Sequence, residues 1–187
     1  MPSPTRPSGP VLFAFSGRSG SGKSLLAQAL ARALGAAYLR IDRIEQALKD
    51  VPGASPEIGE AGYRVAYALA ADQLRMGLSV VADSVNPLAA TRRGWHAVAQ
   101  GAAASVLDIE VRCSDEAEHR RRVASRSADI EGLHMPSWDE LRSRRYDAWE
   151  DATRIVVDTA GLDSSTRLNP CRLSQVFLRG NVGLVAP

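Results

Sequence analysis

Gly17-Arg18-Ser19-Gly20-Ser21-Gly22-Lys23-Ser24 is the stretch that decides the fold of this 187-residue chain. It fits the pattern G-x-x-x-x-G-K-[ST], the phosphate-binding P-loop, whose glycines let backbone N–H groups turn towards phosphate oxygens. The apolar run at residues 11–15 predicts a buried strand before the loop, and residues 25–34 predict a helix after it. The N-terminus of that helix adds positive potential for phosphate groups. The sequence therefore predicts a site for a nucleoside triphosphate.

Two side chains of this motif have expected roles towards the bound nucleotide. Lys23 is expected to reach the β- and γ-phosphates, and the Ser24 hydroxyl to bind Mg²⁺. The expected cofactors are therefore ATP and Mg²⁺. The residues expected to bind the nucleotide are Gly17, Ser19, Gly20, Ser21, Gly22, Lys23, Ser24 and Leu25.

Composition indicates one enzyme domain and gives little sign of other partners. The formal net charge of +2 is too small to indicate nucleic acid as the main partner, and no apolar run is long enough to span a membrane. Residues 1–10 are rich in Pro, Ser and Gly and have no apolar signal core, which predicts a disordered tail and a cytoplasmic protein. Residues 11–161 form the predicted domain, and residues 162–187 a C-terminal segment with a short helix and a tail. The sequence does not indicate an oligomeric state.

Predicted strands and helices alternate along the domain. This pattern predicts an α/β fold, a three-layer α/β/α sandwich around a five-stranded parallel sheet. Helix starts are predicted at Asn86-Pro87, at Ser114 and at the capping box Ser137-x-x-Glu140. The strands after the first are predicted at residues 37–41, 78–82, 106–111 and 155–157. The helices are predicted at residues 25–34, 42–49, 58–76, 86–100, 114–126 and 137–150.

Motifs that are missing narrow the class of P-loop protein. A GTPase would carry an Asn-Lys-x-Asp sequence for base recognition, and the chain has none. Motor-type ATPases end the Mg²⁺-sensing strand in Asp-Glu, whereas Ser84 follows Asp83 here. Both observations count against a hydrolase.

Three further stretches accompany the P-loop. They are Asp42 after the second strand, Asp83-Ser84-Val85-Asn86 after the third, and the basic run His119-Arg120-Arg121-Arg122-Val123-Ala124-Ser125-Arg126. Together they resemble the small P-loop kinases with an adenylate-kinase-like core. That group includes polynucleotide 5′-kinase, gluconate kinase, chloramphenicol phosphotransferase and the zeta-type toxins, and the likeness is strongest to its "predicted kinase" members. The resemblance covers residues 11–161.

The resemblance implies roles for particular residues. Asp42 would be the catalytic base that takes a proton from the substrate hydroxyl, and Asp83 the Walker-B acid that holds Mg²⁺. Arg122 and Arg126 are four apart, so we expect one helix face to carry both catalytic arginines under a short helical lid at residues 127–136. The expected substrate contacts are Asp42, Arg43, Asn86 and Arg92.

Each of these roles has a structural alternative. Asp42 and Asn86 are also good helix caps, and Glu45 stands three residues after Asp42, as in a capping box. Arginines at 43, 92, 122 and 126 have a solvated helix face as the structural alternative. Tyr63 and Tyr67, one helical turn apart, suit either an acceptor pocket or packing between helices.

The function that the resemblance implies is transfer of the γ-phosphoryl group of ATP to a hydroxyl of a small molecule. One alternative is a kinase for a nucleoside, a nucleotide or a polynucleotide 5′ end, although the near-neutral charge does not favour a nucleic-acid groove. The other alternative is an ATPase or switch that regulates a protein partner.

Overall fold

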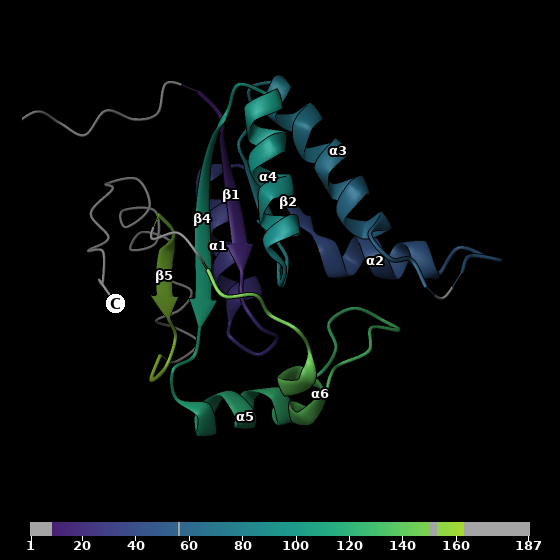
Figure 1. The fold of residues 1–187 in the computed structure, drawn as a ribbon, viewed down its shortest axis with the longest axis vertical. Coiled ribbons are helices and arrows are strands. Elements are labelled where there is room, and N and C mark those ends of the chain that lie inside the picture. The colour runs from purple at the N-terminus through teal and green to yellow at the C-terminus, as the bar shows by residue number, and fades with distance from the viewer. Residues whose placement is uncertain (1–8, 56, 150–152, 163–187) are drawn as a thin grey trace, which may run out of the picture.

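Strands and helices alternate along the chain, except that α2 is followed by α3 and α5 by α6 (Figure 1). The computed structural model describes residues 9–55, 57–149 and 153–162. The elements are β1 (Val11–Ser16), α1 (Lys23–Leu34), β2 (Ala37–Arg40), α2 (Ile41–Lys49), α3 (Ala61–Arg75), β3 (Val80–Asp83), α4 (Ala89–Gly101), β4 (Ser105–Arg112), α5 (Glu116–Ser125), α6 (Trp138–Ser143) and β5 (Ile155–Asp158).

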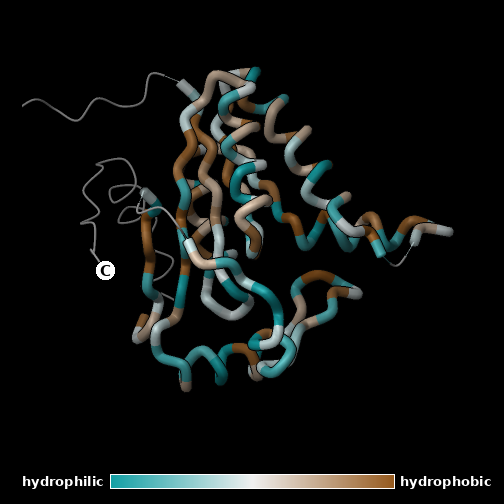
Figure 2. The backbone as a smooth tube through the Cα atoms, viewed as in Figure 1, coloured by the Kyte–Doolittle hydropathy of each residue, from teal (hydrophilic) through white to brown (hydrophobic). Residues whose placement is uncertain are grey.

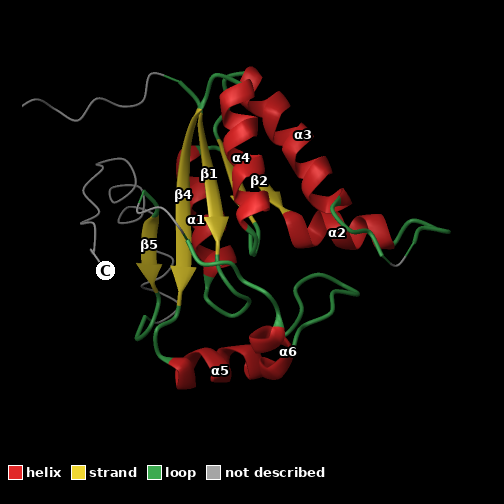
Figure 3. Ribbon diagram, viewed as in Figure 1, coloured by secondary structure: helices red, strands yellow, loops and turns green. Residues whose placement is uncertain are grey.

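All five strands are parallel and stand in the order β2-β3-β1-β4-β5. The sheet runs through the middle of the molecule with helices on its two faces, which confirms the predicted α/β sandwich (Figure 3). Parallel strands end at one edge, and the register places Phe15 and Arg40 beside Asp83 there. In sheets of this kind, ligands bind at that edge.

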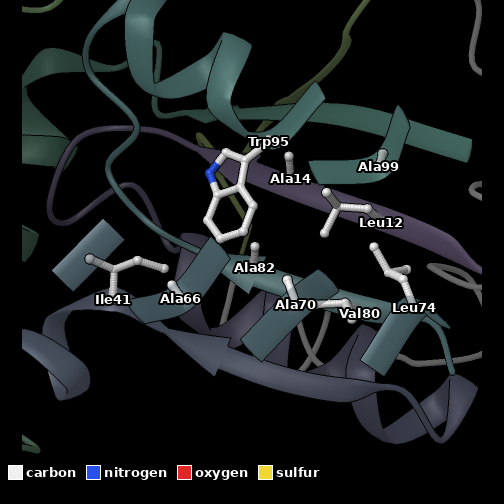
Figure 4. Packing of buried hydrophobic residues seen from close by; sticks show 10 residues of the cluster. All are labelled: Leu12, Ala14, Ile41, Ala66, Ala70, Leu74, Val80, Ala82, Trp95 and Ala99. Carbon is white, nitrogen blue, oxygen red and sulfur yellow. The ribbon is translucent and has the colours of Figure 1, made fainter. Parts of the chain in front are cut away.

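Alternating side chains of the strands fill two hydrophobic layers. On one face, Leu12 and Ala14 pack with Trp95 of α4 and with α3 (Figure 4). On the other, Phe13 and Phe15 pack against α1. Because the central strands are covered on both faces, they are hydrophobic at nearly every position, whereas α5 is strongly hydrophilic (Figure 2). α5 and α6 pack on no strand face and lie across the carboxyl edge of the sheet (Figure 1).

Several predicted helix ends are wrong. α3 begins at Ala61 rather than at residue 58. α5 is capped by Asp115 rather than Ser114, because the Asp115 carboxylate accepts the Glu118 N–H at 2.9 Å. α4 begins at Ala89 after Leu88, because Asn86 has a positive φ of 50° and a fully buried side chain. Asn86 is therefore not its cap.

The capping box of Ser137 and Glu140 is confirmed, but α6 ends at Ser143. The backbone is already extended at Arg144, and beyond it the carbonyls of Asp147 and Ala148 accept hydrogen bonds from Arg92, at 2.6 and 3.1 Å. Among the described residues, no helix has the length and apolar character needed to span a membrane. The predictions for residues 1–8, for residue 150 and for the C-terminal residues 163–187 lie outside the described residues.

Candidate active site

The P-loop connects β1 to α1 in a conformation that requires glycine. Gly17 has φ 142°, and a Cβ atom there would lie 2.2 Å from the Val111 carbonyl oxygen. Gly20 has φ 82°, and its Cβ would lie 2.7 Å from Val123. Gly22, at φ 89°, precedes α1, whose first turn contains no acidic side chain. The helix N-terminus therefore keeps its positive potential for an anion.

Lys23 and Asp83 form a buried ion pair at the base of this loop. The Lys23 ammonium donates to Asp83 Oδ1, and Tyr38 Oη donates to Asp83 Oδ2 at 2.7 Å. Burial alone would raise the pKa of Asp83, but the charge of Lys23 and hydrogen bonds from Lys23, Tyr38 and Ser24 outweigh it and lower the pKa. Asp83 is therefore ionised at neutral pH although only 1% of it is exposed.

This group fits Mg²⁺ that is shared with nucleotide phosphates. The Ser24 hydroxyl lies close enough to Asp83 to help lower the pKa of that carboxyl group. Within residues 9–55, 57–149 and 153–162, no cluster of three or more His, Cys, Asp or Glu side chains can hold a metal without other ligands. Mg²⁺ is commonly held by one or two protein oxygens together with water and substrate phosphates, so Ser24 and Asp83 suffice.

A cleft of about 230 Å³ opens beside the P-loop. Asp42 and Glu45 of α2 stand on one wall, and Tyr63 of α3 extends it. Burial raises the pKa of Glu45, and the neighbouring Asp42 carboxylate adds to the effect. Ten further residues complete the lining: Arg18, Ser19, Ile41, Val85, Pro87, Pro136, Leu141, Arg144, Arg145 and Tyr146.

Asp42 is the second residue of α2, so it is not the helix N-cap. Its side chain is 33% exposed, and its carboxylate lies 3.8 Å from Arg40 Nε. Arg40 also makes two hydrogen bonds to Asp129, at 2.5 and 3.0 Å. Asp42 therefore faces the cleft as a partly exposed carboxylate. Arg43, the next residue, is exposed and does not line the cleft.

The two lid arginines do not share a helix face, contrary to the prediction. α5 ends at Ser125, and Arg126 follows it in extended backbone. Arg122 donates to Thr159 Oγ1 at 2.8 Å, to the Thr159 carbonyl at 2.7 Å and to Glu118. Arg126 donates to the Pro136 carbonyl at 3.3 Å and lies near Asp42 and Arg144, which both affect its pKa. Only Arg126 thus stands by the cleft.

Asn86 and Arg92 also take structural positions. Asn86 is fully buried and donates from Nδ2 to Ser16 Oγ at 3.0 Å. The Arg92 guanidinium binds four backbone carbonyls and stacks on Trp149, with 4.1 Å between Cζ and the ring centroid. These contacts hold residues 146–149 beside α4 and leave both side chains outside the cleft.

The sequence allowed Tyr63 and Tyr67 either to line a pocket or to pack between helices, and the two side chains differ in this respect. Tyr63 lines the cleft, and its hydroxyl accepts the Asn86 N–H at 3.0 Å. Burial raises the pKa of Tyr63 to about 12. Tyr67 packs edge-on against Trp95 and donates to the Thr91 carbonyl at 2.8 Å.

Several contacts of the P-loop were missed by sequence reasoning. Thr159 is fully buried after β5 and donates to the Ser21 carbonyl at 2.8 Å. His119 Nε2 lies 2.8 Å from the Ser19 carbonyl oxygen, and its ring packs on Trp138. No local pattern marks these side chains, although the carboxyl end of a strand was a signal for Thr159.

A second cavity of about 440 Å³ lies between α4 and β4. Arg93, His96 and Asp108 are among its lining residues, and His96 Nε2 lies 2.6 Å from Asp108. No residue of the P-loop lines it. The smaller cleft is therefore the candidate for phosphate chemistry.

Comparison with known proteins agrees with this geometry. A family model described as "AAA domain" matches residues 12–148. No protein with a curated description matches the sequence. Three solved structures share the fold at low sequence identity, as follows.

A presumed kinase of Chloroflexus aurantiacus is 22% identical, with a TM-score of 0.69 over 88% of this chain and 98% of its own. A gluconokinase of Sinorhizobium meliloti is 19% identical, with a TM-score of 0.61 over 95% of this chain and 97% of its own. Kti12 of Chaetomium thermophilum, in complex with ADP–AlF3, is 19% identical, with a TM-score of 0.62 over 87% of this chain and 96% of its own. The matched family covers most of the described fold, and the chain therefore belongs to this AAA-domain family of P-loop proteins, with the α/β fold that these kinase structures share.

Proposed function

We propose that the protein is a Mg²⁺-dependent kinase that transfers the γ-phosphoryl group of ATP to a hydroxyl of a small molecule. The observation that carries the proposal is the cleft itself. One small space is lined by the P-loop residues Arg18 and Ser19 and, on the facing wall, by the Asp42 carboxylate. Phosphoryl transfer requires a positioned acceptor oxygen beside a charge-stabilised phosphate, and this cleft brings the two parts together.

In the proposed reaction, the acceptor oxygen attacks the γ-phosphorus while its proton passes to Asp42. The bond from the γ-phosphorus to the bridging oxygen breaks, and ADP leaves with that electron pair. Lys23 and the N–H groups of the P-loop would hold the β- and γ-phosphates, and Arg126 would neutralise the transferring group. Mg²⁺, held by Ser24 and Asp83, would supply further positive charge. We leave Arg122 out of this group because Thr159 and Glu118 already hold its guanidinium.

The size of the cleft favours a small acceptor over a polynucleotide. Its volume of about 230 Å³ lies below the range of about 300–1,000 Å³ that is usual for pockets of drug-sized ligands. A polynucleotide kinase needs an extended basic groove with aromatic platforms for the bases. The cleft is instead a small space whose lining includes Tyr63, Tyr146 and two prolines.

The second candidate is a nucleotide-dependent switch or ATPase, which the similarity to the fold of Kti12 keeps open. A hydrolase needs a side chain that activates water. Ser84, which stands where such ATPases carry glutamate, is buried and lies 3.4 Å from the Phe15 carbonyl oxygen. We therefore favour the kinase.

Incubation with γ-labelled ATP, Mg²⁺ and a small-molecule extract tests the proposal. We expect label in a new organic phosphate, and slow release of inorganic phosphate when the extract is omitted. Asp42→Asn should slow formation of the labelled product at least about 100-fold, while the matched control Asp72→Asn, at an exposed position on α3 outside the cleft, should not. Fast hydrolysis without extract, unchanged by extract and by Asp42→Asn, would favour the ATPase instead.

A further inference from the structure

Charge is divided unevenly between the two walls of the cleft. The α2 wall carries the carboxylates of Asp42 and Glu45. The opposite wall carries three arginines: Arg18 from the P-loop and Arg144 and Arg145 from the stretch after α6. A small ligand in this space would therefore meet an acidic wall on one side and a basic wall on the other.

Only one of the three arginines has a carboxylate partner among the described residues. Arg145 Nε donates to Asp147 at 2.7 Å. Arg18 donates from one nitrogen to the carbonyl oxygens of Leu141 and Arg144, and its guanidinium lies 5.1 Å from the centre of the Tyr146 ring. These contacts orient Arg18 against the stretch after α6 but leave its charge unbalanced.

Arg144 has the least compensated charge of the group. Within the part of the chain that the structure describes, its guanidinium makes no hydrogen bond or ion pair. Three surroundings affect the pKa of Arg126. Burial lowers it most, the Asp42 carboxylate raises it, and the nearby charge of Arg144 lowers it. Arg126 Nε is itself buried, and none of the described residues accepts a hydrogen bond from it. Two neighbouring guanidiniums with unused donors make a local excess of positive charge, which an anion would stabilise.

In the proposed phosphoryl transfer, only one of these two arginines, Arg126, has a role. Arg126, beside Asp42, would hold the γ-phosphoryl group. Arg144 lies after α6 and outside the P-loop, so it stays available for the acceptor. Since Asp42 and Glu45 repel anions, an acidic acceptor would turn its charged end away from α2 and its hydroxyl end towards Asp42.

From this division of charge we propose that the acceptor is itself an anion, a small hydroxy compound whose carboxylate or phosphate group binds Arg144 and Arg18 while its hydroxyl faces Asp42. This inference rests on the proposed kinase activity. It adds a substrate class to it, and it assigns Arg144 as a specificity-determining residue that binds the non-reacting end of the acceptor.

The first test separates the substrate class from the activity. A small-molecule extract is passed over an anion exchanger, and the unbound and bound fractions are each incubated with the protein, γ-labelled ATP and Mg²⁺. We expect the labelled product from the bound, anionic fraction. A product from the unbound fraction alone would overturn the inference and leave the kinase standing. No organic product from either fraction, with ATP bound and slowly hydrolysed, would overturn the proposed function itself.

The second test places the anion at Arg144. The probes are a neutral hexose, its aldonic acid and its phosphate monoester, together with whichever acceptor the first test identifies. The acid and the ester distinguish a carboxylate site from a phosphate site. Arg144→Gln should raise KM for the preferred anion about 10- to 100-fold, the cost of losing a charge-assisted hydrogen bond. Arg144→Lys should recover part of the loss, and the preference for the anion over the neutral hexose should shrink in parallel.

Two features of the chain allow an effect of Arg144→Gln to be assigned to the lost guanidinium. Arg144→Gln keeps the Arg144 carbonyl that accepts from Arg18, so the contact between the P-loop and α6 is retained. Arg142, two residues earlier and within α6, pairs with Glu116 at an exposed position outside the cleft, which makes Arg142→Gln the matched control. Equal effects of both substitutions, or an effect of Arg144→Gln on kcat with KM and acceptor preference unchanged, would overturn the assignment.

Discussion

The nucleotide side and the acceptor side of the candidate site are built in opposite ways. On the nucleotide side, Lys23 and Asp83 are buried and their charges balance each other. Tyr38 and Ser24 further stabilise the Asp83 carboxylate. The cleft beside the P-loop is more exposed. Arg144 lines it without a side-chain partner among the described residues, and the nearby Arg126 has a buried Nε without one. A common ligand such as a triphosphate can be met by a preformed, internally balanced site. The proposed acceptor would instead be recognised by charges that no described side chain balances.

The largest effect is expected from Lys23→Met. Loss of a phosphate-stabilising cation should lower turnover about 10³- to 10⁵-fold, as for other single cations in phosphoryl transfer. The change also leaves Asp83 as a buried charge without its main partner, so thermal stability should fall too. Kinetics and thermal melts measure the two effects. In the double variant Lys23→Met/Asp83→Asn, stability should recover and turnover should not. Turnover that recovers with stability would mean that the pair is only structural.

Asp42→Asn should lower kcat about 10²- to 10⁴-fold, the usual contribution of a positioned base. Because Asp42 is inside the first turn of α2 and not its cap, the fold should be unaffected. Glu45→Gln, one turn further along the same helix, is the comparison. Steady-state kinetics with a fixed acceptor decides between them: an equal loss in both variants would point to shared electrostatics and not to one base.

The same contrast explains what the sequence could predict. The P-loop is a contiguous motif whose glycines and lysine fix their own local geometry, so β1, the loop and α1 were predictable without the rest of the chain. The alternation of apolar runs similarly predicted the five-stranded parallel sheet. The Asp42 and Asp83 positions followed from the rule that strand ends meet at one edge.

The acceptor side depended on contacts between distant segments. Arg122 and Arg126 share a helical spacing in sequence, but α5 ends between them and sends their side chains to different partners. Arg92 looked available for substrate, yet carbonyls some 55 residues away use its donors. Nothing in the sequence around Arg18 or Tyr146 shows that they meet. Tertiary packing determines where these side chains lie, and local sequence patterns do not predict it.

The corrected positions of the two arginines give a sharper test than the sequence did. Arg126→Lys should lower kcat about 10- to 100-fold, because an ammonium cannot reproduce the forked contact of a guanidinium with phosphate oxygens. Arg122→Lys should chiefly lower thermal stability, because it removes contacts to Thr159 and Glu118. Parallel melts and kinetics on both variants test this division. A kcat loss confined to Arg122→Lys would reverse the assignment.

Tyr38→Phe probes the buried side alone. It removes a hydrogen bond to the Asp83 carboxylate and should destabilise the protein by about 1.5 kcal/mol at pH 7. Asp83 has a lowered pKa in the folded state, so its stabilising contribution is complete above about pH 4 and is lost as the pH falls through the folded pKa. The difference from wild type should therefore shrink below pH 4 in urea titrations. Tyr67→Phe, which removes a bond to a neutral carbonyl, should show a loss that does not depend on pH.

The smallest effect is expected from Ser137→Ala, on the acceptor side. Ser137 and Glu140 cap α6 reciprocally, and the Ser137 N–H is the main cause that lowers the pKa of Glu140 to about 2. Losing the serine side chain should cost about 1 kcal/mol, or about 2–4 °C in Tm. α6 carries Leu141 and leads into Arg144, so loosening it should raise the acceptor KM a few-fold while the nucleotide affinity stays within about twofold.

Titration calorimetry with nucleotide and steady-state kinetics with acceptor make the comparison, with Ser143→Ala at the other end of α6 as the control. A fall in nucleotide affinity alone would mean that α6 stabilises the P-loop through Arg18. α6 would then belong to the nucleotide side of the site and not to the acceptor side.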